Sequence, residues 1–563
     1  MKQPIAIGIE NYKTLIDNNY YYVDKTWMLK ELMNQIGTVS LFTRPRRFGK
    51  TLTLSMIQTF FEDERTSDGE KIDNSHYFDG KKILTAGEKY TSQMGMYPVI
   101  KLSLKSAKQP DFRMAYDCLK EEIAKEYKRH KYILESDKLI DADKEQYQRV
   151  MNRMAAPNEY ATALQFLSQC LKGYSDRNVI ILIDEYDVPL ENAYFKGFYT
   201  QMIDFIRSLF ESALKTNDAL EFALVTGCLR ISRESIFTGL NNLKINSILS
   251  NGYAEYFGFT EPEVEEMLKN YGLEEKFPEA KQWYDGYLFG KTEVYNPWSI
   301  LNYVDAAETD CEALPKAYWS NTSSNSIVRE LIETAEAGAK EEIERLIDGG
   351  TIEKPVHEEI TYEDIHQSQD NLWNFLFFTG YLKKESERFV DDRIYITLSI
   401  PNKEVRHIYR TTIQEWFGNY RKTLDVKSFY QAVLSGNVED TETFLSDLLE
   451  KSISYHDKKE DFYHGVMLGL FSGISGYEMR SNREYGNGRP DLVLCPYNPR
   501  KPLVIFEFKY RKTFKEMPDG CQAALAQIEE KKYAAPFLDK GYQKIIKYGI
   551  CFCEKTCMVQ KAE

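Results

Sequence analysis

Eight residues near the N-terminus have the types and spacing needed to hold the phosphates of a nucleotide. At positions 44–51 the chain reads R-P-R-R-F-G-K-T, which departs from the phosphate-loop pattern G-x-x-x-x-G-K-[ST] only in carrying arginine first. Gly49 lets backbone N–H groups curl around phosphate oxygens, Lys50 brings positive charge to the β- and γ-phosphates, and Thr51 offers a hydroxyl to Mg²⁺. We therefore predict a nucleotide-binding loop, with Arg47 as a further cation beside the phosphates. A basic surface loop before a helix is the alternative.

A second group of candidate residues lies far along the chain, where an apolar run ends in two carboxylates. Residues 178–185, N-V-I-I-L-I-D-E, have the continuous apolar character of a strand buried on both faces. Ligands of open α/β sheets bind at the carboxyl ends of the strands, where these acids stand. Asp184 is predicted to hold Mg²⁺, and Glu185 to polarise the water that attacks the γ-phosphate of ATP. A buried strand with a solvated acidic end remains the alternative.

A third apolar run, residues 220–227, brings a hydroxyl to the end of another predicted strand. In ATPases of this type such a residue lies between the loop and the acidic pair and senses the γ-phosphate, which is the role expected of Thr226. Arg230 and Arg233 follow, and either could contact phosphate as an arginine finger from the same subunit or a neighbouring one. An oligomer is therefore a candidate assembly, and an ordinary turn with surface arginines is an equally good interpretation.

The elements that must position these residues are strands, loops and helices in a regular order. Residues 39–42 predict a buried strand and residues 52–57 the helix after the loop, which is the order that the phosphate-loop motif requires. Together with the two later apolar runs, they indicate an α/β fold built on a P-loop NTPase sheet. Residues 110–170 are charged and predict a helical insertion beside that sheet.

Near the C-terminus a separate set of acidic and basic residues lies on two predicted strands. A glycine-rich turn, G-N-G-R-P-D at 486–491, places Asp491 at the start of one short apolar strand. Glu507 and Lys509 alternate with Phe508 in the next strand, so the two-residue period puts the acid and the lysine on one face. If the two strands are neighbours in a hairpin, Asp491 and Glu507 come together.

Two carboxylates that share a site repel each other unless a divalent cation lies between them, and carboxylate oxygens with water suit Mg²⁺ or Mn²⁺. Asp491 and Glu507 are therefore the predicted metal ligands. Lys509 would then orient or deprotonate the attacking water, or stabilise charge that develops on phosphate. This chemistry fits cleavage of nucleic-acid phosphodiesters, so DNA and RNA are the candidate partners.

The N-terminal motifs together resemble the bacterial AAA-ATPase-like family over about residues 5–305. The matching segments are R-P-R-R-F-G-K-T at 44–51, Y-Y-V-D-K-T at 21–26, I-D-E-Y-D at 183–187, S-I-F-T-G-L-N-N-L at 235–243, W-Y-D-G-Y at 283–287 and Y-N-P-W at 295–298. In that family the loop usually carries arginine at its first position, so the missing glycine is a family trait. The resemblance implies an ATP-binding fold in which hydrolysis is expected and its purpose is open.

The P-D…E-x-K pattern resembles the PD-(D/E)XK nuclease superfamily, and specifically a nuclease-like domain that is often fused to AAA-ATPase-like proteins. Residues 460–470 predict the helix before its core, with Glu460 as an extra acid. Residues 522–533 predict the helix after it, in which Gln527 and Lys531 match positions that the domain commonly keeps polar. The resemblance implies an α/β restriction-endonuclease-like domain, and a fold retained for binding without cleavage is the alternative.

The bulk properties fit a multidomain protein of the cytoplasm, and the family resemblance implies a bacterial one. The chain has 563 residues, too many for one core, and its longest apolar runs are far shorter than a membrane span. Nine scattered cysteines form no disulfide framework and indicate a reducing compartment. We expect Cys551, Cys553 and Cys557 to pack in a core rather than to bind zinc. The net charge of −14 argues against nucleic-acid binding by the whole surface but allows local basic grooves.

Four domains are predicted from these segments. They are a AAA-ATPase-like P-loop core at 1–255, a helical lid at 256–320, a mixed helical and winged-helix-like region at 321–425, and a nuclease-like domain with a helical connector at 426–563. Within the third region, strands are predicted at 375–383 and 393–400.

Two functions of different classes follow from this organisation. In the first, an ATP-binding and ATP-hydrolysing module is coupled to a Mg²⁺- or Mn²⁺-dependent nuclease-like domain. In the second, the chain is a nucleotide-dependent switch or scaffold whose C-terminal domain binds nucleic acid or a partner without cleaving it. Two complete active-site constellations on one chain favour the first function, and the acidic net charge and the loop that lacks its first glycine motivate the second as the alternative.

Overall fold

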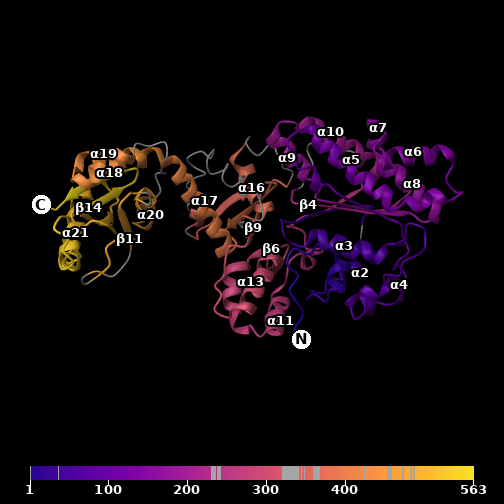
Figure 1. Cartoon of the computed structure of the whole chain (residues 1–563), viewed down its shortest axis with the longest axis horizontal. Coiled ribbons are helices and arrows are strands. Elements are labelled where there is room, and N and C mark those ends of the chain that lie inside the picture. Colours follow the sequence, from indigo (N-terminus) through magenta and orange to yellow (C-terminus); the bar gives the residue numbers. More distant parts are fainter. Residues whose placement is uncertain are drawn as a thin grey trace. The chain divides into compact units, whose positions relative to one another are not determined.

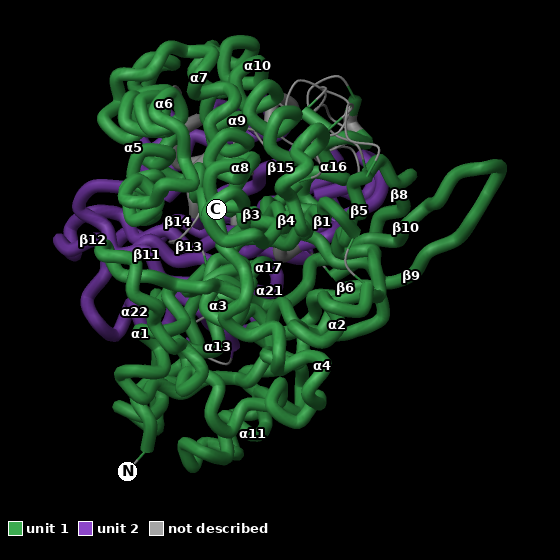
Figure 2. The backbone as a smooth tube through the Cα atoms, turned by 90° about the vertical axis from the view of Figure 1, so that its right-hand side faces the viewer, with its two compact units in different colours: residues 1–323, 349–408 green, residues 324–348, 409–563 purple. Residues whose placement is uncertain are grey.

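The computed structural model describes residues 2–35, 37–229, 236–237, 242–319, 342–343, 345–347, 349–358, 368–421, 426–452, 460–471, 474–481, 485 and 488–562. These fall into two compact units, residues 1–323 with 349–408 (unit 1) and residues 324–348 with 409–563 (unit 2), which Figure 2 colours separately. Within the described residues, no helix has the length and apolar character needed to cross a membrane. The division into four domains stays a prediction.

A five-stranded parallel sheet forms the centre of unit 1, with strand order β2-β3-β4-β1-β5. Its strands are β1 (Val39–Thr43), β2 (Val99–Ser103), β3 (Val179–Asp184), β4 (Leu220–Gly227) and β5 (Leu243–Asn246). Every residue of β1 and β3 is buried, as expected for apolar strands covered on both faces. The strands predicted from the three apolar runs are confirmed, and the fold of this unit is α/β.

Helices cover both faces of this sheet (Figure 1). The helix that follows the phosphate loop, α3 (Lys50–Phe61), lies on one face. The other face carries α5 (Phe112–Arg129), α8 (Ala163–Ser175) and α10 (Tyr199–Phe210). Further helices of unit 1 are α1 (Tyr12–Asp17), α2 (Met28–Gln35), α4 (Glu88–Thr91), α6 (Asp141–Met151), α7 (Pro157–Ala161) and α9 (Val188–Lys196). The helical insertion predicted at 110–170 is thus confirmed in α5 to α8.

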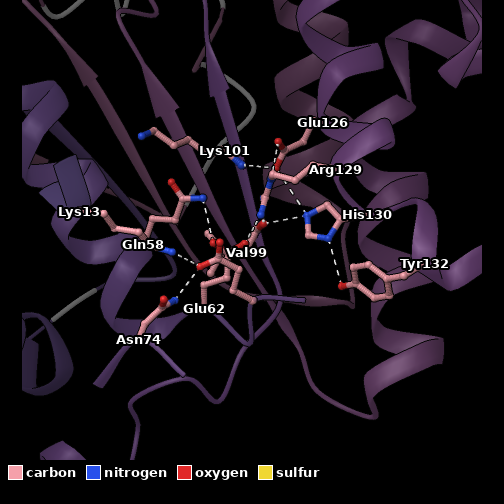
Figure 3. Close-up of polar contacts among 11 residues, drawn as sticks. Lys13, Gln58, Glu62, Asn74, Val99, Lys101, Glu126, Arg129, His130 and Tyr132 are labelled. Carbon is pink, nitrogen blue, oxygen red and sulfur yellow. Dashed lines mark hydrogen bonds and ion pairs between the residues drawn. The ribbon is translucent and has the colours of Figure 1, made fainter. Parts of the chain in front are cut away.

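A buried polar network joins the end of α3 to α5 and to the edge strand β2 (Figure 3). The Arg129 guanidinium forms ion pairs with Glu62 and Glu126 and donates to the carbonyl of Val99. The ring of His130 lies 3.1 Å from the same carbonyl. Burial opposes ionisation of Glu126, but the charge of Arg129 beside it holds the pKa of that carboxyl below its ordinary value. The network therefore fixes the end of the phosphate-loop helix that points away from the loop.

The segment predicted as a helical lid contains three helices and a short hairpin. Its elements are α11 (Glu261–Tyr271), α12 (Phe277–Tyr284), β6 (Tyr287–Phe289), β7 (Thr292–Val294) and α13 (Pro297–Thr309). The first helix begins with a capping box between Thr260 and Glu263, and Pro262 lies in its first turn. The helical character is confirmed, and the role of a lid stays a prediction.

The middle part of the chain corrects one prediction. Residues 375–383 were expected to form a strand, but Phe375 to Phe378 belong to α16 (Gln369–Phe378), whose first turn is capped by the Ser368 side chain. A short apolar run fits a buried helix as well as a strand, and the cap decides between them. A three-stranded antiparallel sheet accompanies this helix, with β8 (Ile352–Pro355), β9 (Lys383–Val390) and β10 (Arg393–Ser399) in the order β8-β10-β9.

The strand predicted at 393–400 is confirmed as β10, and the β9–β10 hairpin projects from the rest of unit 1 (Figure 2). The winged-helix-like interpretation of this part stays a prediction.

Unit 2 is built on a five-stranded mixed sheet of order β11-β12-β13-β14-β15, in which only the β13–β14 pair is parallel. Its strands are β11 (Tyr477–Ser481), β12 (Leu492–Pro496), β13 (Leu503–Tyr510), β14 (Ile545–Cys553) and β15 (Thr556–Lys561). Its helices are α18 (Val426–Ser435), α19 (Val438–Ser452), α20 (Glu460–Phe471), α21 (Met517–Glu530) and α22 (Ala535–Leu538). The helices predicted at 460–470 and 522–533 are confirmed as α20 and α21, although α21 ends at Glu530.

The helical connector is an integral part of the core of unit 2. Phe429 in α18 and Leu445 in α19 belong to the same buried cluster as Phe506 and Tyr548 of the sheet. The opposite face of the sheet packs on α21, where Ile528 lies in a second cluster with β12 and β13. Cysteines 551 and 553 are buried with Met517 and Cys521, so the prediction that they pack in a core is confirmed.

Glu404 is a buried acid within unit 1. It begins the helix α17 (Lys403–Arg421), is fully buried, and accepts hydrogen bonds from the Ser299 hydroxyl at 2.8 Å and the Trp319 N–H at 2.9 Å. Its position joins the start of α17 to α13. Burial raises the pKa of the Glu404 carboxyl from 4.5 to about 7.

Replacement of Glu404 by glutamine should change how the stability of unit 1 depends on pH. Because the folded state favours the protonated acid, Glu404 destabilises it increasingly as the pH rises from the ordinary value through about 7, by roughly 2–4 kcal/mol in total. The thermal midpoint of Glu404→Gln should therefore increase relative to that of the parent as the pH rises from about 5 to about 8. Glu265→Gln, at an exposed site in α11, should show a constant difference. A gap for Glu404→Gln that also stays constant with pH would contradict the prediction.

Candidate functional site

The Asp184 carboxylate brings the three N-terminal motifs together at the carboxyl edge of the parallel sheet. The Thr51 hydroxyl donates to one of its oxygens at 2.7 Å, and the Thr226 hydroxyl donates to the other at 2.5 Å. Strand β4 pairs with both β1 and β3, so Thr226 lies between the phosphate loop and the acidic pair, where the sequence placed it. Asp184 is only 2% exposed, and both of its oxygens therefore have partners inside the protein.

The phosphate loop closes around the Lys50 side chain. The Lys50 ammonium is buried and donates to the carbonyls of Arg44 and Pro45, each at 2.9 Å. Gly49 has a φ of +80°, a left-handed conformation that glycine adopts without steric cost. Helix α3 begins immediately after it, so the N–H groups of its first turn face the loop.

Arg44, which stands where the pattern has glycine, is a structural residue. It is fully buried, and its Nη1 donates to the carbonyls of Thr43 at 2.9 Å and Asn246 at 2.7 Å. The guanidinium also lies 5.1 Å from the ring centre of Phe257 and 5.2 Å from that of Phe289. Burial lowers its pKa to about 9. The side chain thus joins the ends of β1 and β5, and its backbone is not in the left-handed region.

The loop also packs on the predicted lid. The Arg47 guanidinium lies 4.4 Å from the ring centre of Trp298 in α13, and Arg47 has a left-handed φ of +70°. The buried ring of Phe48 meets the rings of Tyr287 and Phe289 at centre distances of 5.0 and 5.1 Å. Trp298 stood in a motif of the sequence, but its contact with the loop is decided by the tertiary structure.

Glu185 is placed to contact solvent at the edge of the site. It has a left-handed φ of +54°, which turns its side chain away from the buried course of β3, and it is partly exposed. Burial and the neighbouring charge of Asp184 raise the pKa of the Glu185 carboxyl, and the charge of Lys50 opposes them. A carboxylate with a raised pKa is a better proton acceptor than an ordinary one.

Asp187 is a residue whose contribution the sequence did not reveal. Its carboxylate accepts the backbone N–H groups of Cys228 at 2.7 Å and Leu229 at 3.1 Å, which shapes the turn after β4. The turn has no room for a side chain at Gly227, where a Cβ would lie 2.5 Å from the Tyr186 ring. Asp187 belongs to the I-D-E-Y-D motif, which was the available signal. The candidate arginine fingers, Arg230 and Arg233, lie outside the described residues.

The residues of this edge fit a nucleotide with Mg²⁺. Thr51 and Asp184 supply hydroxyl and carboxylate oxygens, which are the ligands that Mg²⁺ takes beside phosphates. The Lys50 ammonium donates to two backbone carbonyls, and phosphate oxygens could take their place as its acceptors. These assignments stay predictions for Arg47, Gly49, Lys50, Thr51, Asp184, Glu185 and Thr226.

In unit 2, the acids predicted to share a metal are neighbours. Strands β12 and β13 are antiparallel with Leu492 opposite Phe506, which places Asp491 and Glu507 next to each other. An oxygen of Asp491 accepts the Phe508 N–H at 2.7 Å. The expected hairpin is therefore confirmed, and the acids lie at its end.

Glu507 carries an unsatisfied buried oxygen. The residue is 2% exposed, and its Oε2 has no hydrogen-bond partner among the described residues. Its Oε1 accepts from the Lys509 ammonium at 3.2 Å, so the acid and the lysine share one face of β13 as predicted. Burial, with the charge of Asp491, raises the pKa of Glu507 to about 7. An unsatisfied oxygen beside a second carboxylate fits a divalent cation, which would supply the missing positive charge.

Residues around α21 complete this region. The Tyr533 hydroxyl donates to the Arg489 carbonyl at 3.2 Å and accepts from the Gln527 amide at 3.3 Å. Burial raises the pKa of Tyr533, and the charges of Glu507 and Asp491 raise it further. The sequence predicted Tyr533 only as the last residue of the helix at 522–533, and its contact with the Arg489 carbonyl is decided by the fold.

The sequence also singled out Lys531 and Glu460 for this domain. Lys531 lies beyond α21 on the surface, 4.0 Å from Glu530, and the Glu460 side chain lies outside the described part of the protein. Within the described residues, no group of three or more His, Cys, Asp or Glu side chains could hold a metal ion, so the candidate site rests on Asp491 and Glu507 alone.

Replacement by glycine should change thermal stability differently at Arg44 and at Arg47. Arg44→Gly should lower the thermal midpoint of unit 1, because it leaves a cavity and removes the bonds to Thr43 and Asn246, at a cost of roughly 2–4 kcal/mol. Arg47→Gly should change it little, because glycine relieves the left-handed backbone and so offsets the lost contact with Trp298. Calorimetry of the two variants measures this. A midpoint of Arg44→Gly equal to that of the parent would show that Arg44 is not a structural residue.

Comparison with known proteins finds one matching family in unit 1 and another in unit 2. Residues 6–237 match the family described as "Predicted AAA-ATPase", and residues 458–562 match the PD-(D/E)XK nuclease superfamily. The chain is also 24% identical over 555 residues to the "Uncharacterized protein in vnfD 5′ region" of Azotobacter chroococcum mcd 1, covering 96% of this chain and 95% of that protein. The chain thus carries a AAA-ATPase-like domain in its N-terminal part and a domain of the PD-(D/E)XK nuclease superfamily at its C-terminus.

Proposed function

We propose that the protein binds and hydrolyses ATP at the carboxyl edge of the parallel sheet, and that unit 2 cleaves nucleic-acid phosphodiesters with Mg²⁺ or Mn²⁺. The observation that carries the ATPase function is the meeting of Thr51 and Thr226 on the Asp184 carboxylate. The nuclease function rests on the unsatisfied Glu507 oxygen beside Asp491 and Lys509.

At the ATPase edge, each residue has a distinct task. Thr51 and Asp184 would hold Mg²⁺, which would neutralise charge on the β- and γ-phosphates. Lys50 exchanges its backbone carbonyls for phosphate oxygens, while Thr226 contacts the γ-phosphate from the end of β4. Glu185, with its raised pKa, accepts the proton of the attacking water.

At the nuclease edge, Asp491 and Glu507 would hold the divalent cation, which would supply a Lewis acid for the phosphodiester. Lys509 keeps its ammonium beside Glu507, where it orients the attacking water or stabilises charge on the phosphate. The exposed basic residues near this strand are Arg500, Lys501, Lys512 and Lys515. Such a group can follow a phosphate backbone, so DNA and RNA are both candidate substrates. We also propose that the protein acts in the cytoplasm and that an oligomer is compatible with the site.

Glutamine at position 185 should separate ATP binding from hydrolysis. Glu185→Gln keeps the size of the side chain but cannot accept a proton, so ATP turnover should fall by about 100-fold or more while ATP binding stays within a few-fold. Turnover of radiolabelled ATP and equilibrium binding measure the two effects. Glu145→Gln, at an exposed site in α6, is the matched control and should behave like the parent. Undiminished turnover by Glu185→Gln would remove this residue from the mechanism.

Alanine at position 491 should abolish a metal-dependent cleavage. With Mn²⁺ and either plasmid or single-stranded substrates, Asp491→Ala should cut about 100-fold more slowly or not at all, because the cation loses a ligand. Asp519→Ala, an exposed aspartate of α21, should cut like the parent. Equal cleavage by parent and Asp491→Ala would indicate a contaminant. No cleavage by either, with or without ATP, would favour the scaffold function.

A further inference from the structure

Unit 1 contains a cavity of about 440 Å³ that is separate from the nucleotide edge. It lies beyond the C-terminal end of α3, whereas the phosphate loop lies at the N-terminal end of the same helix. Asp63 and Arg65 follow α3 into the cavity, and Tyr174 and Arg177 enter it at the end of α8 just before β3. The cavity therefore opens at the amino edge of the sheet, opposite the edge that gathers Thr51 and Asp184. Its volume is in the range of small-ligand sites.

The lining of this cavity carries a clear excess of positive charge. Its charged side chains are Arg65, Lys71, Lys138, Arg177 and one carboxylate, Asp63. The Asp63 carboxylate is shared, 2.7 Å from Arg65 and 3.4 Å from Lys71. On a chain with a net charge of −14, four cations around one acid form a local electrostatic feature of the opposite sign.

The two remaining cations are less neutralised. Lys138 donates to the Tyr174 carbonyl at 2.7 Å and lies 3.3 Å from Asp176, whose side chain is 88% exposed. Within the described residues, the Arg177 side chain forms no hydrogen bond or ion pair, and the residue is exposed. Mutual repulsion of these cations would be relieved by an anion between them. Two of the four are arginines, whose forked donors match phosphate oxygens.

One wall of the cavity is held rigid by buried structure. The Arg65 guanidinium lies 5.6 Å from the ring centre of Tyr174, and the Tyr132 ring meets Tyr174 edge-on at 5.3 Å. Tyr132 belongs to the network of Figure 3, in which its hydroxyl lies 3.2 Å from the His130 ring. The aromatic wall and Arg65 are therefore positioned before any ligand arrives, which lowers the entropic cost of binding.

We propose that this cavity binds phosphate groups, at a site distinct from the nucleotide loop. A neutral ligand would gain nothing from the cluster of cations, whereas a phosphate offers several charged oxygens to the donors that line the cavity. The phosphate could belong to a free small molecule or to a nucleic-acid strand, since both present the same group. The inference goes beyond the proposed ATPase and nuclease functions and does not depend on either.

The test measures binding of inorganic pyrophosphate by calorimetry, in EDTA, to full-length protein that carries Lys50→Ala. Removal of Lys50 suppresses binding at the phosphate loop, and EDTA removes metal-mediated binding. In this background we expect saturable binding that weakens as salt is added, and Arg177→Glu should reduce the affinity about tenfold or more. Arg113→Glu, an exposed arginine at the start of α5, reverses the same charge away from the cavity and should leave the affinity unchanged.

A second arm uses a short 5′-phosphorylated single-stranded oligonucleotide in place of pyrophosphate. Tighter binding of the oligonucleotide, again sensitive to Arg177→Glu, would assign the phosphate to a nucleic acid, and tighter binding of pyrophosphate would assign it to a small molecule. Arg177 has no side-chain partner among the described residues, so Arg177→Glu should keep the parent's thermal midpoint. No saturable binding in either arm, or equal affinity for Arg177→Glu and Arg113→Glu, would overturn the proposal.

Discussion

The carboxylate of Asp184 is the contact on which the N-terminal site depends. It accepts hydroxyls from Thr51 at the start of α3 and from Thr226 at the end of β4, so one buried acid joins three segments that are far apart in the chain. This is possible only because β4 lies between β1 and β3 in a parallel sheet, which brings the carboxyl ends of all three strands to one edge. A buried carboxylate needs such partners, and the two hydroxyls provide them at the same place where a cation could bind.

Side-chain contacts with the rest of unit 1 hold the phosphate loop in place, in addition to its own backbone. Arg44 joins the ends of β1 and β5, and Phe48 packs on the hairpin that precedes α13. A glycine at the first position of the loop would leave the loop its freedom but remove this anchor. The loop and the segment around Trp298 therefore form one packed body, so a ligand at the loop would also contact groups that the segment holds in place.

In unit 2, a strand pair brings two carboxylates together without fully compensating their charge. The hairpin of β12 and β13 brings Asp491 and Glu507 together, and within the described residues Glu507 is paired with one cation, Lys509, on one of its two oxygens. The other oxygen is buried without a partner among the described residues. Such a group is costly in a folded protein unless it is protonated or bound, and the raised pKa of Glu507 reflects that cost.

Much of the fold was accessible from the sequence because its strands are apolar without interruption. Strands β1, β3 and β4 could be located since a strand buried on both faces has no polar alternation, and each ends at a residue with functional chemistry. The pairing of Asp491 with Glu507 followed from the two-residue period and one hairpin. A short apolar run was ambiguous, however, and the last turn of α16 was predicted as part of a strand because helix and strand share that composition.

The sequence by itself determined which residues could bind phosphate and metal, since their types and local spacing set that chemistry. The tertiary structure alone decided which distant residues support them. Four examples depend on contacts between segments far apart in the chain. They are Arg44 against two aromatic rings, Asp187 on the turn after β4, Tyr533 on the Arg489 carbonyl and α18 in the core of unit 2. Periodicity and motifs describe only neighbours along the chain, so contacts of this kind become visible only when the strands are in order.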